Sequence, residues 1–111
     1  MYLIHLLEAF VNITFSDMGI IPLLGTGAVQ NFNKIISEKY VDVLDPVHKQ
    51  KIQELCLRVL GNISINHDGK QECIDEKVII NAWKYLDSQV YEERLNASLV
   101  LMSATIHLNG K

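Results

Sequence analysis

The stretch Leu60-Gly-Asn-Ile-Ser-Ile-Asn-His-Asp-Gly69 decides the fold, because two similar stretches occur elsewhere in the chain. They are Phe10-Val-Asn-Ile-Thr-Phe-Ser-Asp-Met-Gly19 and Leu101-Met-Ser-Ala-Thr-Ile-His-Leu-Asn-Gly110. Each follows an apolar segment with helical periodicity, and we expect each helix to end at its glycine. The glycines are separated by 50 and 41 positions. A period of about 40 to 47 residues is typical of two- and three-helix repeats, so the sequence predicts an all-α repeat architecture.

The central repeat contains one long helix that we expect to run from Pro46 to Ile65, with Asp45 as its N-cap. Its apolar residues follow the 3.6-residue period and are Ile52, Cys56, Val59, Leu60 and Ile63. Two shorter helices and a second long helix are expected over 70–76, 78–86 and 90–106. The order short, medium, long is typical of armadillo units, whereas HEAT units have two helices of similar length. We therefore predict an armadillo-type α-solenoid, a right-handed superhelix of about two and a half repeats.

The whole chain, 1–111, is expected to form one segment of this solenoid. Its parts are the third helix of a partial repeat at 1–19, a repeat at 20–69 with an insertion near 38–46, and a final repeat at 70–111. Solenoid repeats bury their apolar faces only against neighbouring repeats. Since the chain begins partway through a repeat, we expect a fragment, a short isoform or a piece of a longer solenoid.

Composition favours a folded protein that binds neither nucleic acid nor membrane. Hydrophobic residues make up 49% of the chain and charged residues 21%, and the net charge of -3 comes from 10 basic and 13 acidic residues spread along it. No basic stripe could neutralise a run of phosphates. No segment approaches the roughly 20 apolar residues of a membrane-spanning helix. We expect a soluble, cytoplasmic chain whose two cysteines, Cys56 and Cys73, are reduced and buried.

Two longer stretches also carry a resemblance to a known family. The run Leu57-Arg-Val-Leu-Gly-Asn-Ile-Ser-Ile-Asn-His-Asp-Gly-Lys-Gln-Glu-Cys73 resembles the junction between successive armadillo repeats. Together with Leu95-Asn-Ala-Ser-Leu-Val-Leu-Met-Ser-Ala-Thr-Ile-His-Leu-Asn-Gly-Lys111, it is similar to the carboxy-terminal repeats of the armadillo-repeat radial spoke head family of motile cilia, also described as the rhabdoid tumour deletion region family. The resemblance implies a scaffold of the ciliary axoneme that docks onto other radial spoke subunits.

In armadillo proteins the third helices line the concave face, and alignment of the three glycines places nine residues there. This predicted ladder consists of Ile4, Glu8, Asn12, Glu54, Arg58, Asn62, Leu95, Leu99 and Ser103. Other interpretations of these residues stay open. Glu54 and Arg58 can form an ion pair on a solvated helix, and the amides of Asn12 and Asn62 can bond to nearby backbone. Leu95 and Leu99 can be covered by another repeat. Nuclear import receptors carry a tryptophan four positions before each groove asparagine. In this chain Glu8 and Arg58 occupy the positions four residues before Asn12 and Asn62, which argues against that mode of peptide binding.

Nothing in the sequence indicates catalysis. The four histidines, His5, His48, His67 and His107, lie in separate segments without a metal-binding spacing. The Gly25-Thr26-Gly27 turn lacks the lysine of a phosphate loop. The only tryptophan, Trp83, is expected in the core. We therefore predict a non-catalytic protein without cofactor or small-molecule substrate, with two functional hypotheses: a structural scaffold of the radial spoke, or an adaptor that binds peptides in its concave groove.

Overall fold

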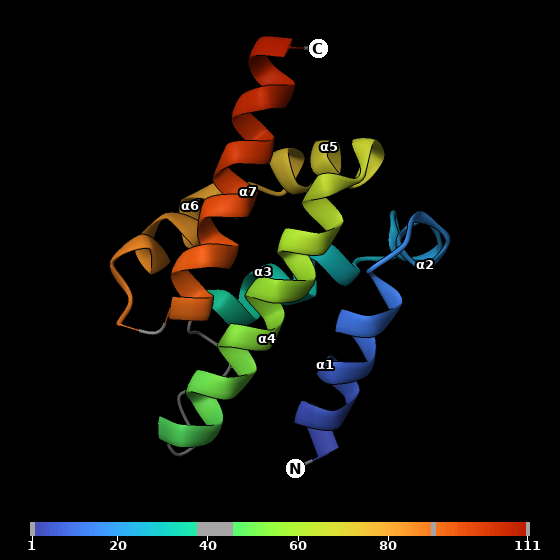
Figure 1. Cartoon of the computed structure of the whole chain (residues 1–111). Coiled ribbons are helices and arrows are strands. Elements are labelled where there is room, and N and C mark those ends of the chain that lie inside the picture. Colours follow the sequence, from blue (N-terminus) through green and yellow to red (C-terminus); the bar gives the residue numbers. More distant parts are fainter. Residues whose placement is uncertain (1, 38–45, 90, 111) are drawn as a thin grey trace.

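Three long helices form one layer of the molecule. The computed structural model describes the backbone of residues 2–37, 46–89 and 91–110, and the side chains of 4–37, 48–89, 91 and 93–102. Within these residues the chain forms helices and turns, without a strand. Figure 1 shows the long helices α1 (Tyr2–Ile13), α4 (Pro46–Ile65) and α7 (Tyr91–Gly110) running in the same direction, with α4 between the other two.

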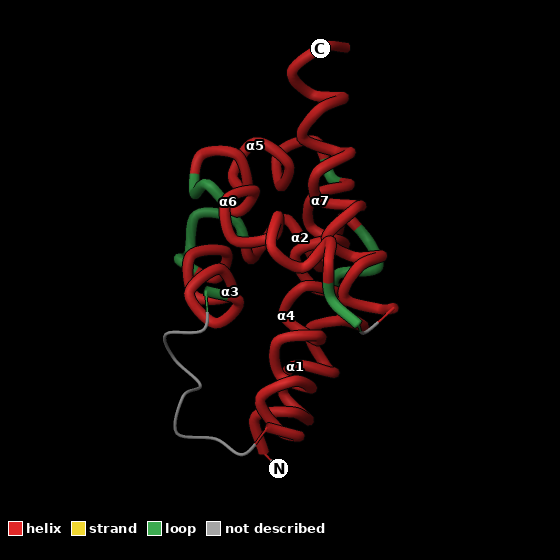
Figure 2. The backbone as a smooth tube through the Cα atoms, turned by 90° about the vertical axis from the view of Figure 1, so that its left-hand side faces the viewer, coloured by secondary structure: helices red, strands yellow, loops and turns green. Residues whose placement is uncertain are grey.

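Shorter helices connect the long ones. They are α2 (Asp17–Ile20), α3 (Ala28–Ile36), α5 (His67–Asp75) and α6 (Val78–Ala82), with 3-10 turns η1 (Ile21–Leu23) and η2 (Trp83–Asp87). In the view of Figure 2, α3 and α6 lie on one side of the long-helix layer. The helix α3 packs on α4, and α5, α6 and η2 pack on α7. The all-α class predicted from the sequence is therefore confirmed.

The core is centred on α4, the middle long helix. Its five predicted apolar residues, Ile52, Cys56, Val59, Leu60 and Ile63, are all 0% exposed. Neighbouring helices add side chains to the same cluster, among them Leu7 from α1, Val29 and Ile36 from α3, and Val100 from α7. Because α4 has a neighbour on several sides, it buries most of its circumference, whereas a helix at the surface buries a single stripe.

Two of the three repeated glycines, Gly19 and Gly69, do not end a long helix, contrary to the prediction, whereas α7 ends at Gly110 as predicted. The helix α1 ends at Ile13 and α4 at Ile65, and Gly19 and Gly69 lie within the following helices α2 and α5. A Cβ atom on Gly19 would overlap the carbonyl oxygen of Ile13 and lie 2.7 Å from its Cγ2 atom. A Cβ on Gly69 would meet the same two atoms of Ile63, the Cγ2 at 2.8 Å. Glycine recurs because the short helix crosses the end of the long one too closely for a side chain.

A second contact recurs at these two corners. The Thr14 hydroxyl lies within hydrogen-bond distance of the carbonyl oxygens of Phe10 and Val11, at 2.8 and 3.1 Å, and the Ser64 hydroxyl donates to that of Gly61 at 2.8 Å. Both hydroxyl residues are buried, so the bond satisfies a group that water cannot reach. The α1–α2 and α4–α5 corners thus repeat the same contacts at equivalent positions of the sequence.

Trp83 is not in the core, contrary to the prediction. Its side chain is 66% exposed, whereas Tyr85 is 5% exposed and donates its hydroxyl to the carbonyl oxygen of Ile36 at 2.6 Å. The predicted helix over 78–86 is α6 only as far as Ala82, after which the chain tightens into η2. The buried positions are Val78, Ala82 and Tyr85, which leaves Trp83 on the opposite side.

Cys56 and Cys73 are free and buried, as expected. Burial raises the pKa of both thiols. The pKa of Cys73 rises to about 12, with a smaller contribution from the adjacent Glu72 carboxylate. The predicted N-cap Asp45 and the predicted insertion near 38–46 fall on residues that the structure leaves undescribed, apart from Pro46 at the start of α4.

Candidate protein-binding groove

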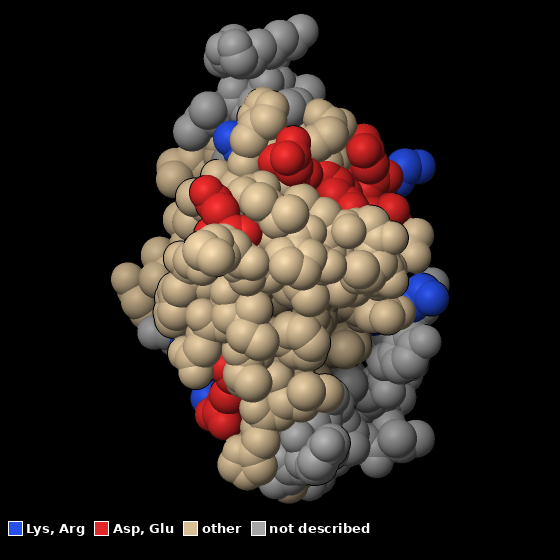
Figure 3. Space-filling view, turned by 90° about the vertical axis from the view of Figure 1, so that its right-hand side faces the viewer, with Lys and Arg blue, Asp and Glu red and all other residues tan. Residues whose placement is uncertain are grey.

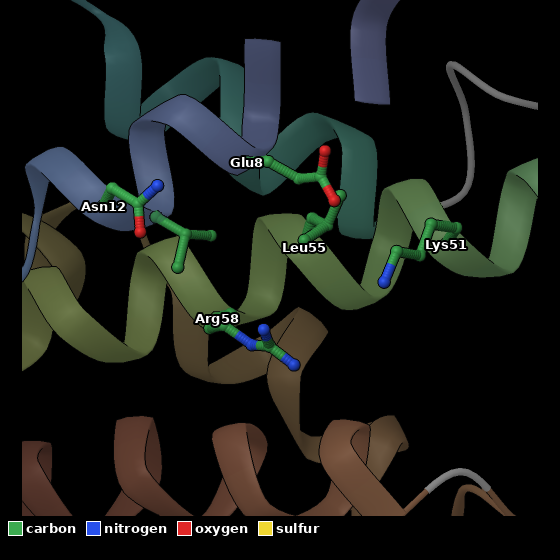
Figure 4. A pocket seen from close by; sticks show the side chains of 6 residues that line it. Glu8, Asn12, Lys51, Leu55 and Arg58 are labelled. Carbon is green, nitrogen blue, oxygen red and sulfur yellow. The ribbon is translucent and has the colours of Figure 1, made fainter. Parts of the chain in front are cut away.

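A groove of about 350 Å³ opens between α1 and α4. It is shown in Figure 4 and is lined by Glu8, Val11, Asn12, Lys51, Leu55 and Arg58. Val11 and Leu55 form an apolar floor, 6% and 2% exposed, while the other four side chains are polar or charged. An apolar floor with a polar rim can bury part of a ligand and fix its orientation by hydrogen bonds.

The α4 side of the groove is basic at its two ends. Lys51, Leu55 and Arg58 are spaced four and three residues apart, which places them on one face of the helix. Figure 4 shows the charged ends of Lys51 and Arg58 extending toward each other along this face. The Arg58 Nη2 atom also lies 3.1 Å from Glu54 Oε1, with 32% and 12% of the two side chains exposed. This contact fixes the guanidinium at the rim.

The α1 side is acidic and more exposed. The Glu8 carboxylate is 48% exposed, and its Oε1 atom lies 3.3 Å from Nδ1 of His5. Asn12, one turn further along α1, is also exposed and lines the groove. The groove therefore presents an amide and a carboxylate opposite two cationic side chains, and carries both signs of charge.

Asn62 has a different role from the one expected for a ladder residue. Its side-chain amide donates to the carbonyl oxygen of Val11 at 3.3 Å and to the hydroxyl of Thr14 at 3.1 Å. Val11 is in the last turn of α1 and Thr14 directly follows that helix, so both acceptors lie where the end of α1 packs on α4. The structure thus uses this amide to hold α1 against α4, next to the groove.

The structure brings together three of the predicted ladder residues in the groove: Glu8, Asn12 and Arg58. Glu54 stands beside them through its contact with Arg58. Leu95 is 41% exposed on α7 and Leu99 is half-buried, and neither lines this groove, while Ile4 packs against the core. Ser103 lies on α7, and its side chain is outside the described residues.

Sequence reasoning missed Lys51, Val11 and Leu55. Lys51 precedes Arg58 by seven residues, so two-turn spacing along α4 could have indicated it. Val11 and Leu55 read as ordinary core residues, and their place at the floor depends on how closely α1 approaches α4. The distance between α1 and α4 depends on how the two helices pack, and it cannot be predicted from the sequence of either helix alone.

A smaller hollow of about 140 Å³ lies beside the predicted Gly25-Thr26-Gly27 turn. Gly25 and Gly27 have φ angles of 77° and 88°, a left-handed conformation that favours glycine. The backbone N–H of Gly25 donates to Glu72 Oε1 at 2.7 Å, which ties the turn to α5. Across the side chains that the structure describes, no group of three or more His, Cys, Asp or Glu residues is placed to hold a metal ion.

No family model, curated protein or solved structure matches this chain. Over the described residues, none of the helices combines the length and apolar character needed to cross a membrane.

Proposed function

We propose that this chain is a non-catalytic protein-binding module of the armadillo type, and that it binds an extended segment of its partner in the groove between α1 and α4. Three observations support the repeat architecture. The long helices run side by side in one direction, α3 and α6 lie on one side of them, and the glycine and hydroxyl contacts recur at the α1–α2 and α4–α5 corners.

The observation that carries the binding proposal is the groove itself. It is open, and its polar groups come from two different helices, so a partner can contact both at once. An extended peptide carries backbone donors and acceptors on both sides, which Asn12 can pair with. Lys51 and Glu8 provide opposite charges for its side chains. Such a groove fits the adaptor form of the proposal, in which the partner binds reversibly.

The scaffold form of the proposal makes the chain a structural component of the axonemal radial spoke, as the family resemblance implies. It locates the chain in the cilium and assigns it radial spoke subunits as partners. The apolar side chains exposed on α1 and α2 favour this form, because a subunit of a stable assembly has faces that its neighbours cover. The two forms share protein binding and differ in the permanence of the complex.

The decisive experiment is an affinity capture with the tagged chain from ciliated cells, with a lysate of nonciliated cells as control. It compares the native chain with Lys51→Glu and Arg58→Glu, and with Lys34→Glu as a matched charge reversal on the exposed side of α3. Circular dichroism checks that each variant stays folded. Bound proteins are identified by mass spectrometry.

Each outcome of the capture tests a different part of the proposal. Proteins captured by the native chain and by Lys34→Glu, and lost with both groove variants, support binding in the groove. Enrichment of radial spoke subunits supports the scaffold form, whereas recovery of other signalling or transport proteins alone supports the adaptor form. Capture that is equal for all four proteins contradicts the groove assignment.

A further inference from the structure

One stripe of α1 is apolar and uncovered. Leu6, Ala9 and Ile13 are spaced three and four residues apart, so they lie on the same face of the helix. Leu6 is 44% and Ile13 47% exposed, and Ala9 is exposed as well. The inward face of α1, with Leu7 and Val11, packs in the core. We call Leu6, Ala9 and Ile13 the outer stripe.

The equivalent stripe is completely buried in α4. The recurring glycine contacts fix the correspondence, since Ile13 contacts Gly19 as Ile63 contacts Gly69. Counting back along each helix pairs Leu6 with Cys56 and Ala9 with Val59. Cys56, Val59 and Ile63 are all 0% exposed. A position that serves as core in α4 therefore lies at the surface in α1.

A short amphipathic helix packs on α4 in the same chain. The helix α3 packs on α4 and buries Val29, Phe32 and Ile36, which are 0%, 6% and 0% exposed and share one face. Its opposite face, with Gln30 and Lys34, is exposed. The α3–α4 contact thus shows what kind of element complements a long helix of this chain: a helix of about two turns with three apolar residues on one face.

The surroundings of the outer stripe suit the same kind of element. Figure 3 shows a broad surface over the α1 and α2 side of the molecule that is almost free of charged side chains, with acidic residues toward its edges. Phe15, Met18 and Ile21, which follow the stripe in the chain, are 71%, 87% and 57% exposed. An exposed apolar patch of this extent is typical of a protein interaction site. The absence of charge indicates a partner face that is itself uncharged.

We propose that the outer stripe of α1 is a second docking site, and that it takes an amphipathic α-helix of a partner protein with apolar residues at positions i, i+3 and i+7. The partner helix covers Leu6, Ala9 and Ile13 with the kind of apolar face that α3 turns toward α4. This docking site is separate from the groove, whose lining residues Glu8 and Asn12 lie on an adjacent face of α1.

The chain itself provides the probe. The probe is a synthetic peptide with the sequence of residues 27–37, in which Gln30→Glu is joined to Lys34 by a lactam bond. The lactam keeps the peptide helical, and both linked positions are on the exposed face of α3, so the apolar face stays free. Its binding to the full chain is measured by fluorescence anisotropy. A second peptide with Phe32→Asp tests the apolar face. The chain variants are Leu6→Ser and Ile13→Ser, with Ile80→Ser as the control, because Ile80 is an exposed apolar residue, at 68% exposure, on a different helix, α6.

We expect saturable one-to-one binding that each stripe variant weakens by about tenfold or more, and that Ile80→Ser and the groove variant Lys51→Glu leave unchanged. Affinity should change little between about 0.05 and about 0.5 M salt, because the contact is uncharged. Absence of binding, equal binding of the Phe32→Asp peptide, or equal loss in Ile80→Ser overturns the proposal. So does self-association of the chain that Ile13→Ser abolishes and the peptide does not inhibit, since the stripe then takes a second copy.

Discussion

The side-chain amide of Asn62 on α4 donates to the hydroxyl of Thr14, the residue that directly follows α1, at 3.1 Å. The same amide donates to the carbonyl oxygen of Val11 in the last turn of α1, so one residue bonds two acceptors at the end of the neighbouring helix. Because Asn62 stands next to the groove, the spacing between α1 and α4 at this end depends on it. A residue predicted to contact a partner therefore helps to hold together the two helices that form the groove.

Replacing Asn62 by alanine should lower the free energy of unfolding by about 1–2 kcal/mol, because two partly buried acceptors lose their donor. Urea denaturation followed by circular dichroism measures the effect. Asn12→Ala is the matched control, since Asn12 occupies the equivalent position on α1 and is exposed; it should change stability by less than about 0.5 kcal/mol. Equal losses in the two variants would contradict the assigned role of Asn62.

Replacing Gly69 by alanine should destabilise the fold by about 2–3 kcal/mol, because the new Cβ would overlap the backbone of Ile63 and force α5 away from α4. Gly61→Ala is the comparison. A Cβ at Gly61 would lie 3.3 Å from the side-chain oxygen of Asn96, and alanine gains about 1 kcal/mol of helix propensity over glycine. The loss in Gly61→Ala should therefore be clearly smaller, as measured by the midpoint of urea unfolding. The reverse order would show that α5 can shift without cost.

The hydroxyl of Tyr85 contributes to the core, whereas the indole of Trp83 does not. Tyr85→Phe removes the bond to the Ile36 carbonyl oxygen and should cost about 1–2 kcal/mol. Trp83→Phe should cost less than about 0.5 kcal/mol, because the side chain is 66% exposed. Thermal unfolding monitored by circular dichroism distinguishes them. A larger loss in Trp83→Phe would restore the core position that the sequence suggested.

Neither cysteine should react with a thiol reagent while the protein is folded. Cys56 is 0% and Cys73 3% exposed, and burial raises both pKa values, so the nucleophilic thiolate is scarce near neutral pH. Titration with a chromogenic disulfide at about pH 8 should detect no thiol in buffer and both thiols in denaturant. Rapid labelling of one thiol in buffer would indicate local opening of α4 or α5.

The same pKa shift predicts a loss of stability in alkali. The Cys73 pKa rises from 9.0 to about 12 on folding, so between these values the folded chain retains a proton that the unfolded chain releases. Stability from this group is complete below about pH 9 and falls as the pH rises toward about 12. Urea unfolding at increasing pH should show a smaller alkaline loss in Cys73→Ala than in the native chain. An identical pH dependence in the two proteins would contradict the shift.

The helical class and the long helix α4 were predictable, because its apolar residues recur every 3.6 positions and proline marks its start. The reason why glycine recurs at Gly19 and Gly69 was not predictable from the sequence. Sequence convention associates glycine with helix ends, whereas Gly69 is needed by a contact across the corner with Ile63. Trp83 and Tyr85 are both large aromatic residues two positions apart, and only the packing of η2 on α7 decides which one is buried.

The candidate site was predictable only in part. Alignment of the repeats placed Glu8 and Asn12 on one helix and Arg58 on the next, and these three line the groove. The role of Asn62 depends on Thr14, which is 48 residues away, and no local pattern links the two. Leu95 was aligned with Glu54 by the same rule, yet it does not line the groove, because the groove lies between α1 and α4 and Leu95 is on α7.

The exposure of Trp83 determines how this protein can be followed by light. As the only tryptophan, it supplies all of the indole fluorescence, and its ring is already largely in water in the folded state. Its emission should therefore shift little on unfolding. A ligand that covers η2 would instead move the emission toward the blue, while one that occupies the groove or the outer stripe would leave it unchanged. The indole is thus a built-in reporter for the one side of the molecule to which neither proposed site belongs.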